Sequence, residues 1–101
     1  MSSLPQPVRR ETALAAGAAA AALLEDLVLA VAGPGDAPVS LTLDYGARPR
    51  TGESVVAEAW VERATRTLFF ISARLTRAAD GAVLITGSAV LRRAADVQGA
   101  A

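Results

Sequence analysis

The sequence of 101 residues contains neither cysteine nor histidine. Their absence excludes disulfides, thiolate nucleophiles and cysteine-bound zinc. It also excludes histidine bases, histidine metal ligands and every Ser-His-Asp triad. Any catalysis must therefore use carboxylates, hydroxyl groups, arginines or backbone dipoles, and we expect neither a cofactor nor a bound metal ion.

Lysine is absent as well, so all ten basic residues are arginines, and ten acidic residues bring the formal net charge to zero. A balanced chain has no overall field to hold nucleic acid or an anionic membrane, so we expect neither as a partner. The exclusive use of arginine fits either a bias of composition or a need for bidentate contacts to phosphate.

The length of the chain suits one domain, which we take as residues 1–101. Hydrophobic residues make up 52% of the chain and charged residues 20%, a balance that argues against disorder. Much of the apolar content is alanine, which favours helices but buries little area. A core of small residues in so short a chain favours self-association.

Arg9-Arg10 precedes an apolar run, and this order superficially resembles an export signal. Glu25 and Asp26 interrupt the run just before the candidate cleavage site at residues 30–32. Two adjacent carboxylates also disfavour a membrane span. We therefore expect a cytoplasmic protein.

A helix is predicted from about Glu11 to Ala32. Glu11 and Thr12 suit the N-terminal end of a helix, where capping oxygens and negative charge are favourable. The Gly-Pro-Gly sequence at residues 33–35 ends it. Residues 13–24 are apolar on every side, which predicts a helix that is buried all round.

The rest of the chain alternates in the manner of strands, at about residues 39–46, 54–63, 67–76 and 82–92. The pair at residues 80–81, Asp-Gly, tolerates the positive φ of a tight hairpin. Strands that follow one another through short turns form an antiparallel meander. The prediction is an α+β fold in which one long helix covers one face of a four-strand antiparallel sheet.

Four stretches carry a resemblance to a known family: SLTLDYGARP at residues 40–49, TGESVVAEA at 51–59, ATRTLFF at 64–70 and ADGAVLITG at 79–87. Over about residues 13–92 the chain resembles the hotdog fold, an antiparallel sheet wrapped around one long central helix. It is most similar to acyl-CoA thioesterases of the phenylacetate-pathway type.

This resemblance implies hydrolysis of an acyl-CoA or acyl-carrier thioester at the interface of a homodimer or tetramer. Backbone N–H groups at the start of the helix would polarise the thioester carbonyl. A carboxylate on the helix of the partner subunit would activate water or attack the carbonyl. Two other readings stay open: a non-catalytic hotdog module that binds acyl-CoA or serves in assembly, and an unrelated helix-and-meander binding domain.

The family's His-Gly-Gly sequence at the helix start is not present, and two registers are possible. If residues 10–12 take its place, the position of the catalytic carboxylate falls near Ala19. If residues 16–18 take its place, it falls on Glu25, with Asp26 beside it, and ALLEDL resembles the family's Ala-Leu-Leu-Asp-Glu-Ala. We favour the second register, with Glu25 and Asp26 as the catalytic candidates.

Adjacent helical residues point about 100° apart, so at most one of Glu25 and Asp26 is expected to face the sheet. The alternative is that both are ordinary exposed charges. Gly17 is a candidate for close approach of the substrate, or for helix–sheet packing. Thr12, beside Glu11, is a candidate for orienting water, or a simple cap.

Three arginines near predicted turns, Arg48, Arg50 and Arg66, are candidates for binding CoA phosphates through charge-assisted hydrogen bonds. The ordinary reading is that they are solvated turn charges. Trp60 falls on the polar face of its strand, which suggests a subunit contact.

Overall fold

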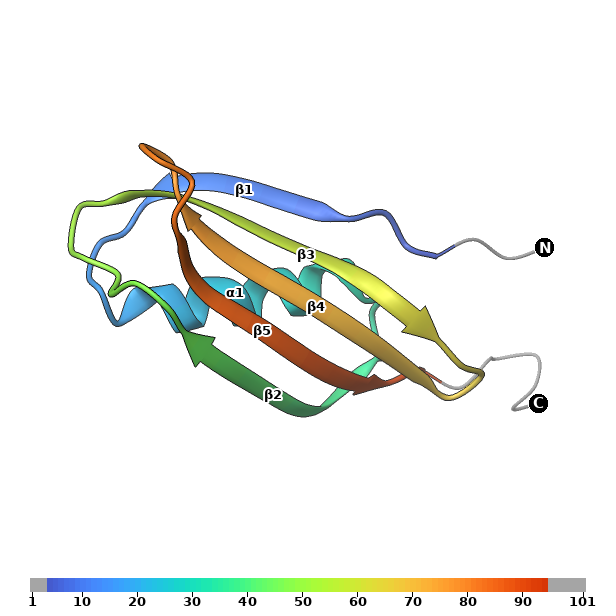
Figure 1. The fold of residues 1–101 in the computed structure, drawn as a ribbon. Coiled ribbons are helices and arrows are strands. Elements are labelled where there is room, and N and C mark those ends of the chain that lie inside the picture. Colours follow the sequence, from blue (N-terminus) through green and yellow to red (C-terminus); the bar gives the residue numbers. More distant parts are fainter. Residues whose placement is uncertain (1–3, 95–101) are drawn as a thin grey trace.

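The computed structural model describes residues 4–94, so the first three and the last seven residues of the predicted domain lie outside it. One helix and five strands make up this part of the chain (Figure 1). In chain order they are β1 (Val8–Ala13), α1 (Ala19–Val31), β2 (Ala37–Tyr45), β3 (Ser54–Ala64), β4 (Leu68–Arg77) and β5 (Val83–Arg92). The last four strands lie within two residues of their predicted bounds.

All five strands form one antiparallel sheet in the order β1-β3-β4-β5-β2. Only β3, β4 and β5 form the predicted meander, because β2 lies beside β5 and not beside β3. The loop at residues 46–53 therefore has to cross the end of the sheet. The prediction of four strands was wrong by one, since β1 pairs with β3 and adds a fifth.

The helix begins at Ala19, and the prediction that it starts near Glu11 was wrong. Glu11 and Thr12 belong to β1, where they pair with Val56 and Val55 of β3. The backbone hydrogen bonds of this ladder outweigh the helix propensity of a few alanines, because β3 would otherwise leave its edge unpaired.

Leu14 marks the point where the chain leaves the sheet. Its N–H donates to the carbonyl oxygen of Glu53 at 2.9 Å, and its carbonyl oxygen accepts from the N–H of Gly52 at 2.7 Å. Its side chain is 3% exposed and belongs to the core. A helix could not run through this residue without breaking both bonds, so the turn at residues 15–18 must precede α1.

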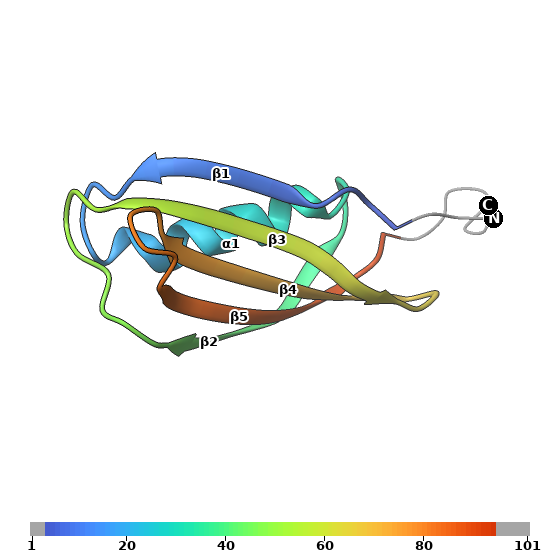
Figure 2. The same cartoon turned by 45° about the horizontal axis from the view of Figure 1, so that its top comes forward.

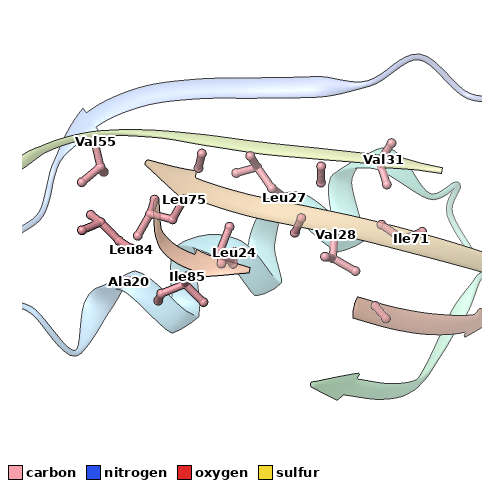
Figure 3. Close-up of a cluster of buried hydrophobic side chains, with 14 of the residues drawn as sticks. Ala20, Leu24, Leu27, Val28, Val31, Val55, Ile71, Leu75, Leu84 and Ile85 are labelled. Carbon is pink, nitrogen blue, oxygen red and sulfur yellow. The ribbon is translucent and has the colours of Figure 1, made fainter. Parts of the chain in front are cut away.

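The core lies between α1 and one face of the sheet (Figures 1 and 2). The helix contributes the buried residues Ala20, Leu24, Leu27, Val28 and Val31. They point toward side chains of the sheet such as Val55, Ile71, Leu75, Leu84 and Ile85 (Figure 3).

The side of the helix that faces away from the sheet is exposed, so the expectation of a helix buried all round was wrong for this chain. Leu29 on that side is 41% exposed. An exposed alanine is common on protein surfaces, so a helix rich in alanine can be apolar on every side and still be buried on only one. No helix within residues 4–94 is long and apolar enough to cross a membrane.

Candidate functional site

An open hollow of about 570 Å³ lies where the N-terminal end of α1 meets the loop between β2 and β3. It is lined by Gly17, Ala18, Tyr45, Arg48, Pro49, Arg50 and Thr51. The sequence separates these residues by about thirty positions. The crossing of the loop over the end of the sheet brings them together.

Gly17 is held against this loop by a close backbone contact. A Cβ atom at Gly17 would lie 3.0 Å from the carbonyl oxygen of Pro49, which is tighter than ordinary packing. The structure therefore assigns Gly17 a packing role between helix and loop. The same contact places its backbone at the wall of the hollow.

The turn into α1 leaves backbone donors at the hollow. The N–H groups of Ala19 and Ala20 donate to the carbonyl oxygens of Ala16 and Gly17, at 3.0 and 3.2 Å. The N–H groups of Gly17 and Ala18 make no hydrogen bond within residues 4–94, and no side chain caps the helix. A helix start with uncapped donors attracts negative charge.

Two arginines add positive charge to the same hollow. Neither Arg48 nor Arg50 has a carboxylate within 4.0 Å in the described part of the chain. A hydrogen bond within the loop that carries them stabilises its conformation: the N–H of Arg50 donates to Glu53 Oε1 at 3.1 Å. Tyr45, at the end of β2, is 61% exposed and faces the same space.

Glu53 ties this loop to the hairpin between β4 and β5. Its carboxylate accepts a hydrogen bond from Nε of Arg77, whose guanidinium also contacts Asp80 at 3.4 Å. The hydrogen bond from Arg77 holds the pKa of Glu53 below its ordinary range. The N–H of Ala82, with help from Arg77, likewise lowers the pKa of Asp80.

The two carboxylates of α1 lie on different flanks of the helix. Asp26 lines a second hollow, of about 290 Å³, whose other walls come from the end of β1 and the first turns of α1. Glu25 does not line it, because it points about 100° away. Ala22 and Leu29, both exposed, lie between the two flanks, so Glu25 faces the side of the sheet where β2 forms the edge.

The structure separates the two registers considered for the helix start. Residues 10–12 lie in β1, so they cannot form the turn into a helix. Residues 16–18 form that turn. The turn therefore lies where the second register expects it, and the catalytic role of Glu25 in that register stays a prediction.

The sequence-predicted residues fall into four groups, one of which is Glu25 alone, since it lines neither hollow. Gly17, Arg48 and Arg50 meet in the first hollow, and Thr12 meets Asp26 in the second. Arg66 lies at the other end of the sheet, in the turn between β3 and β4, and is not part of either hollow in its own chain.

Sequence reasoning missed Tyr45 and Thr51 as residues of the hollow. Strict alternation places Tyr45 in line with Leu41 and Leu43, on the apolar face of its strand, and so gives no sign that it lines the hollow. The signal available was the polar corner that follows, Gly-Ala-Arg-Pro, which ends the strand at Tyr45.

Comparison with known proteins gives one family and one fold. The model of the thioesterase superfamily matches residues 13–84. Among curated proteins, no sequence matches the chain.

Three similar solved structures are thioesterase-type proteins. Thioesterase superfamily member 2 from zebrafish is 22% identical, over 91% of this chain and 78% of that chain, with a TM-score of 0.78. A phenylacetic acid degradation-related protein from Ralstonia eutropha JMP134 is 20% identical, over 85% and 75%, with a TM-score of 0.68. A hypothetical thioesterase protein from Streptococcus pneumoniae TIGR4, solved with coenzyme A, is 11% identical, over 87% and 78%, with a TM-score of 0.74. The predicted hotdog-type α+β fold is confirmed.

Proposed function

Because the chain belongs to the thioesterase superfamily, we propose that it hydrolyses an acyl-CoA or acyl-carrier thioester. The observation that carries this proposal is the first hollow. Gly17 and Ala18, whose N–H groups make no hydrogen bond within residues 4–94, line it together with Arg48 and Arg50. Amide donors suit the oxygen of a thioester carbonyl, and guanidinium groups suit the phosphates of its carrier.

The carboxylate comes from a second copy of the chain in this proposal. Glu25 lies seven residues after Ala18, about 10 Å along the axis of α1 at about 1.5 Å per residue. That is too far for one thioester to touch both groups in the same chain. Glu25 faces the β2 side, where a partner subunit can bring its own helix start close.

The edge of β2 supports this assembly. Within residues 4–94, β2 pairs only with β5, so its other edge has free backbone donors and acceptors. Val39 of β2, which is 55% exposed, adds apolar surface to that strand. Antiparallel pairing of two β2 strands gives a homodimer. A tetramer would need a further contact, such as the half-exposed Trp60 on the open face of the sheet.

The reaction then proceeds through one carboxylate and two amides. Glu25 of one subunit removes a proton from water as the water oxygen attacks the carbonyl carbon. The negative charge that develops on the carbonyl oxygen is stabilised by the N–H groups of Gly17 and Ala18 of the other subunit. The carbon–sulfur bond breaks, and the thiolate takes the proton back from Glu25. The products are a carboxylic acid and the free thiol.

Asp26 is the second catalytic candidate and Thr12 its neighbour in the second hollow. If they perform the chemistry, the substrate lies beside β1 and not at the β2 interface. The phosphate role predicted for Arg66 has no support in the hollow of its own chain. We place the reaction in the cytoplasm.

A non-catalytic hotdog module remains the alternative, and Ala16 favours it. This residue stands where the resemblance leads us to expect histidine, so one polar group of the family's helix start is missing. A protein that binds acyl-CoA without turnover would keep the hollow and its arginines but would not need Glu25.

Release of free thiol from a panel of short, long and aryl acyl-CoA esters tests the proposal. We expect turnover by the wild type, a loss of about 100-fold or more in kcat with Glu25→Gln, and little change with Asp26→Asn, the matched control on the next helix position. The opposite pattern would move the chemistry to the second hollow. Binding of CoA esters without any thiol release would favour the non-catalytic module.

A further inference from the structure

Four arginines gather at the end of the sheet that is opposite the first hollow (Figure 1). They lie at the end of β3, in the β3–β4 turn, at the end of β5 and just after it. The strand register brings them together, because Ala64 pairs with Phe69 and Leu68 pairs with Arg92. We call this end of the sheet the arginine end: Arg63, Arg66, Arg92 and Arg93. Arg63 and Arg92 lie on the open face of the sheet, whereas Arg93 stacks on the core residue Phe69 from the face that α1 covers.

Two of these guanidinium groups are held in place by aromatic rings. The guanidinium of Arg63 lies 5.1 Å from the centre of the Phe70 ring, and that of Arg93 lies 4.5 Å from the centre of the Phe69 ring. Arg93 also donates to the carbonyl oxygen of Thr65 at 2.7 Å. Stacking orients a guanidinium and leaves most of its in-plane donors free for an incoming anion.

The arginine end has no carboxylate partner within residues 4–94, although three arginines elsewhere in the chain form ion pairs. Two nearby acids are already hydrogen-bonded to other groups. Glu62 accepts from the indole N–H of Trp60, and Asp36 accepts from the N–H groups of Gly33 and Ala94. Both acids keep their negative charge, but four arginines outnumber them, so this end has an excess of positive charge within residues 4–94.

The shape of the surface indicates the class of its partner. Arg63 and Arg92 lie on strands that flank β4, so their backbones are about 10 Å apart at about 4.8 Å per strand. Neither hollow described above is lined by any residue of the arginine end. Small molecules bind in concave sites, whereas a charged surface outside such a hollow suits the complementary face of a macromolecule.

We propose that the arginine end docks the acidic face of a protein that carries the acyl thioester. The identity of this partner rests on the proposed function, but the docking surface does not. Antiparallel pairing of two β2 strands places the arginine end of one subunit at the same end of the dimer as the first hollow of the other. Only a few strands, about 10 to 20 Å, then separate the docked carrier from the hollow that its thioester must enter.

The experiment titrates the full chain with a purified acyl carrier protein that bears its phosphopantetheine arm, and follows binding by calorimetry. We expect association at about 0.01 M ionic strength that weakens at about 0.15 M, because surface charges are screened. The variant Arg63→Glu/Arg92→Glu should bind the carrier at least about tenfold more weakly than wild type. The matched control, Arg9→Glu/Arg10→Glu on the edge strand β1, reverses the same number of charges outside the arginine end and should change the affinity less than about twofold.

Thermal unfolding of both variants shows whether either substitution disturbs the fold. The proposal is overturned if wild type does not bind the carrier protein, or if both variants weaken binding equally. It is also overturned if Arg63→Glu/Arg92→Glu weakens the binding of free CoA as much as that of the carrier, since the surface would then recognise phosphate alone. Carrier binding that depends on the arginine end, in a chain that releases no thiol from any ester, supports the docking surface and rejects the proposed hydrolysis.

Discussion

At the scale of single residues, Gly17 is the position where the start of the helix lies closest to the loop at residues 46–53. Its φ is not positive, so alanine fits the backbone conformation, but the added Cβ would lie 3.0 Å from the carbonyl oxygen of Pro49. We expect Gly17→Ala to displace the loop from the helix start. The expected cost in the free energy of unfolding is about 1 kcal/mol. The expected loss in kcat/KM for thiol release is larger than this loss of stability alone would cause, because the two proposed oxyanion donors move with the turn.

Gly33→Ala is the matched control, since a Cβ there meets Asp36 at 3.4 Å, an ordinary contact, at the far end of the helix. Urea unfolding and thiol release on both variants separate a general loss of stability from a local effect. Equal losses of activity in the two variants would contradict a role for Gly17 at the site.

At the scale of elements, the loop at residues 46–53 is held to the β4–β5 hairpin by Glu53 and Arg77. Because the folded state depresses the pKa of Glu53, its ion pair stabilises the fold above the unfolded pKa, about 4.3, and this contribution is lost as pH falls through the folded pKa. We expect the free energy of unfolding to fall between about pH 5 and pH 3, and to fall less steeply in Glu53→Gln. Urea unfolding across this range measures the slope.

Arg77→Gln provides the reciprocal control, because it removes the same hydrogen bond from the other side. The double variant should lose less free energy of unfolding than the two single variants lose together, because the two side chains contact each other. Additive losses would mean that the two side chains stabilise the loop separately.

At the scale of the whole molecule, the edge of β2 decides whether a complete site exists. Lysines on a sheet edge block pairing with a second chain. The variant Val39→Lys/Thr42→Lys should therefore be a monomer of about 10.3 kDa, and it should also lose thiol release. Light scattering and the thiol assay measure the two effects. Glu11→Lys on the other edge strand, β1, should leave the mass unchanged. A β2 variant that remains dimeric would place the interface elsewhere.

The sequence by itself determined the chemistry that is possible and most of the secondary structure. Without histidine or cysteine, only carboxylates, amides and arginines remain for a site, and strand alternation located β2, β3, β4 and β5 within two residues. Local patterns suffice there because alternation and turn residues act over a few positions.

Only the tertiary structure decided where the helix begins and which residues share a site. The local sequence of residues 11–18 suits a helix, but pairing with the edge of β3 and the two hydrogen bonds of Leu14 selected a strand for residues 8–13. The meeting of Gly17 with Arg48 and Arg50, and the separation of Arg66 from both, follow from the loop that crosses the end of the sheet. Such contacts join positions about thirty residues apart, and they depend on strand order, which the periodicity of a single strand does not encode.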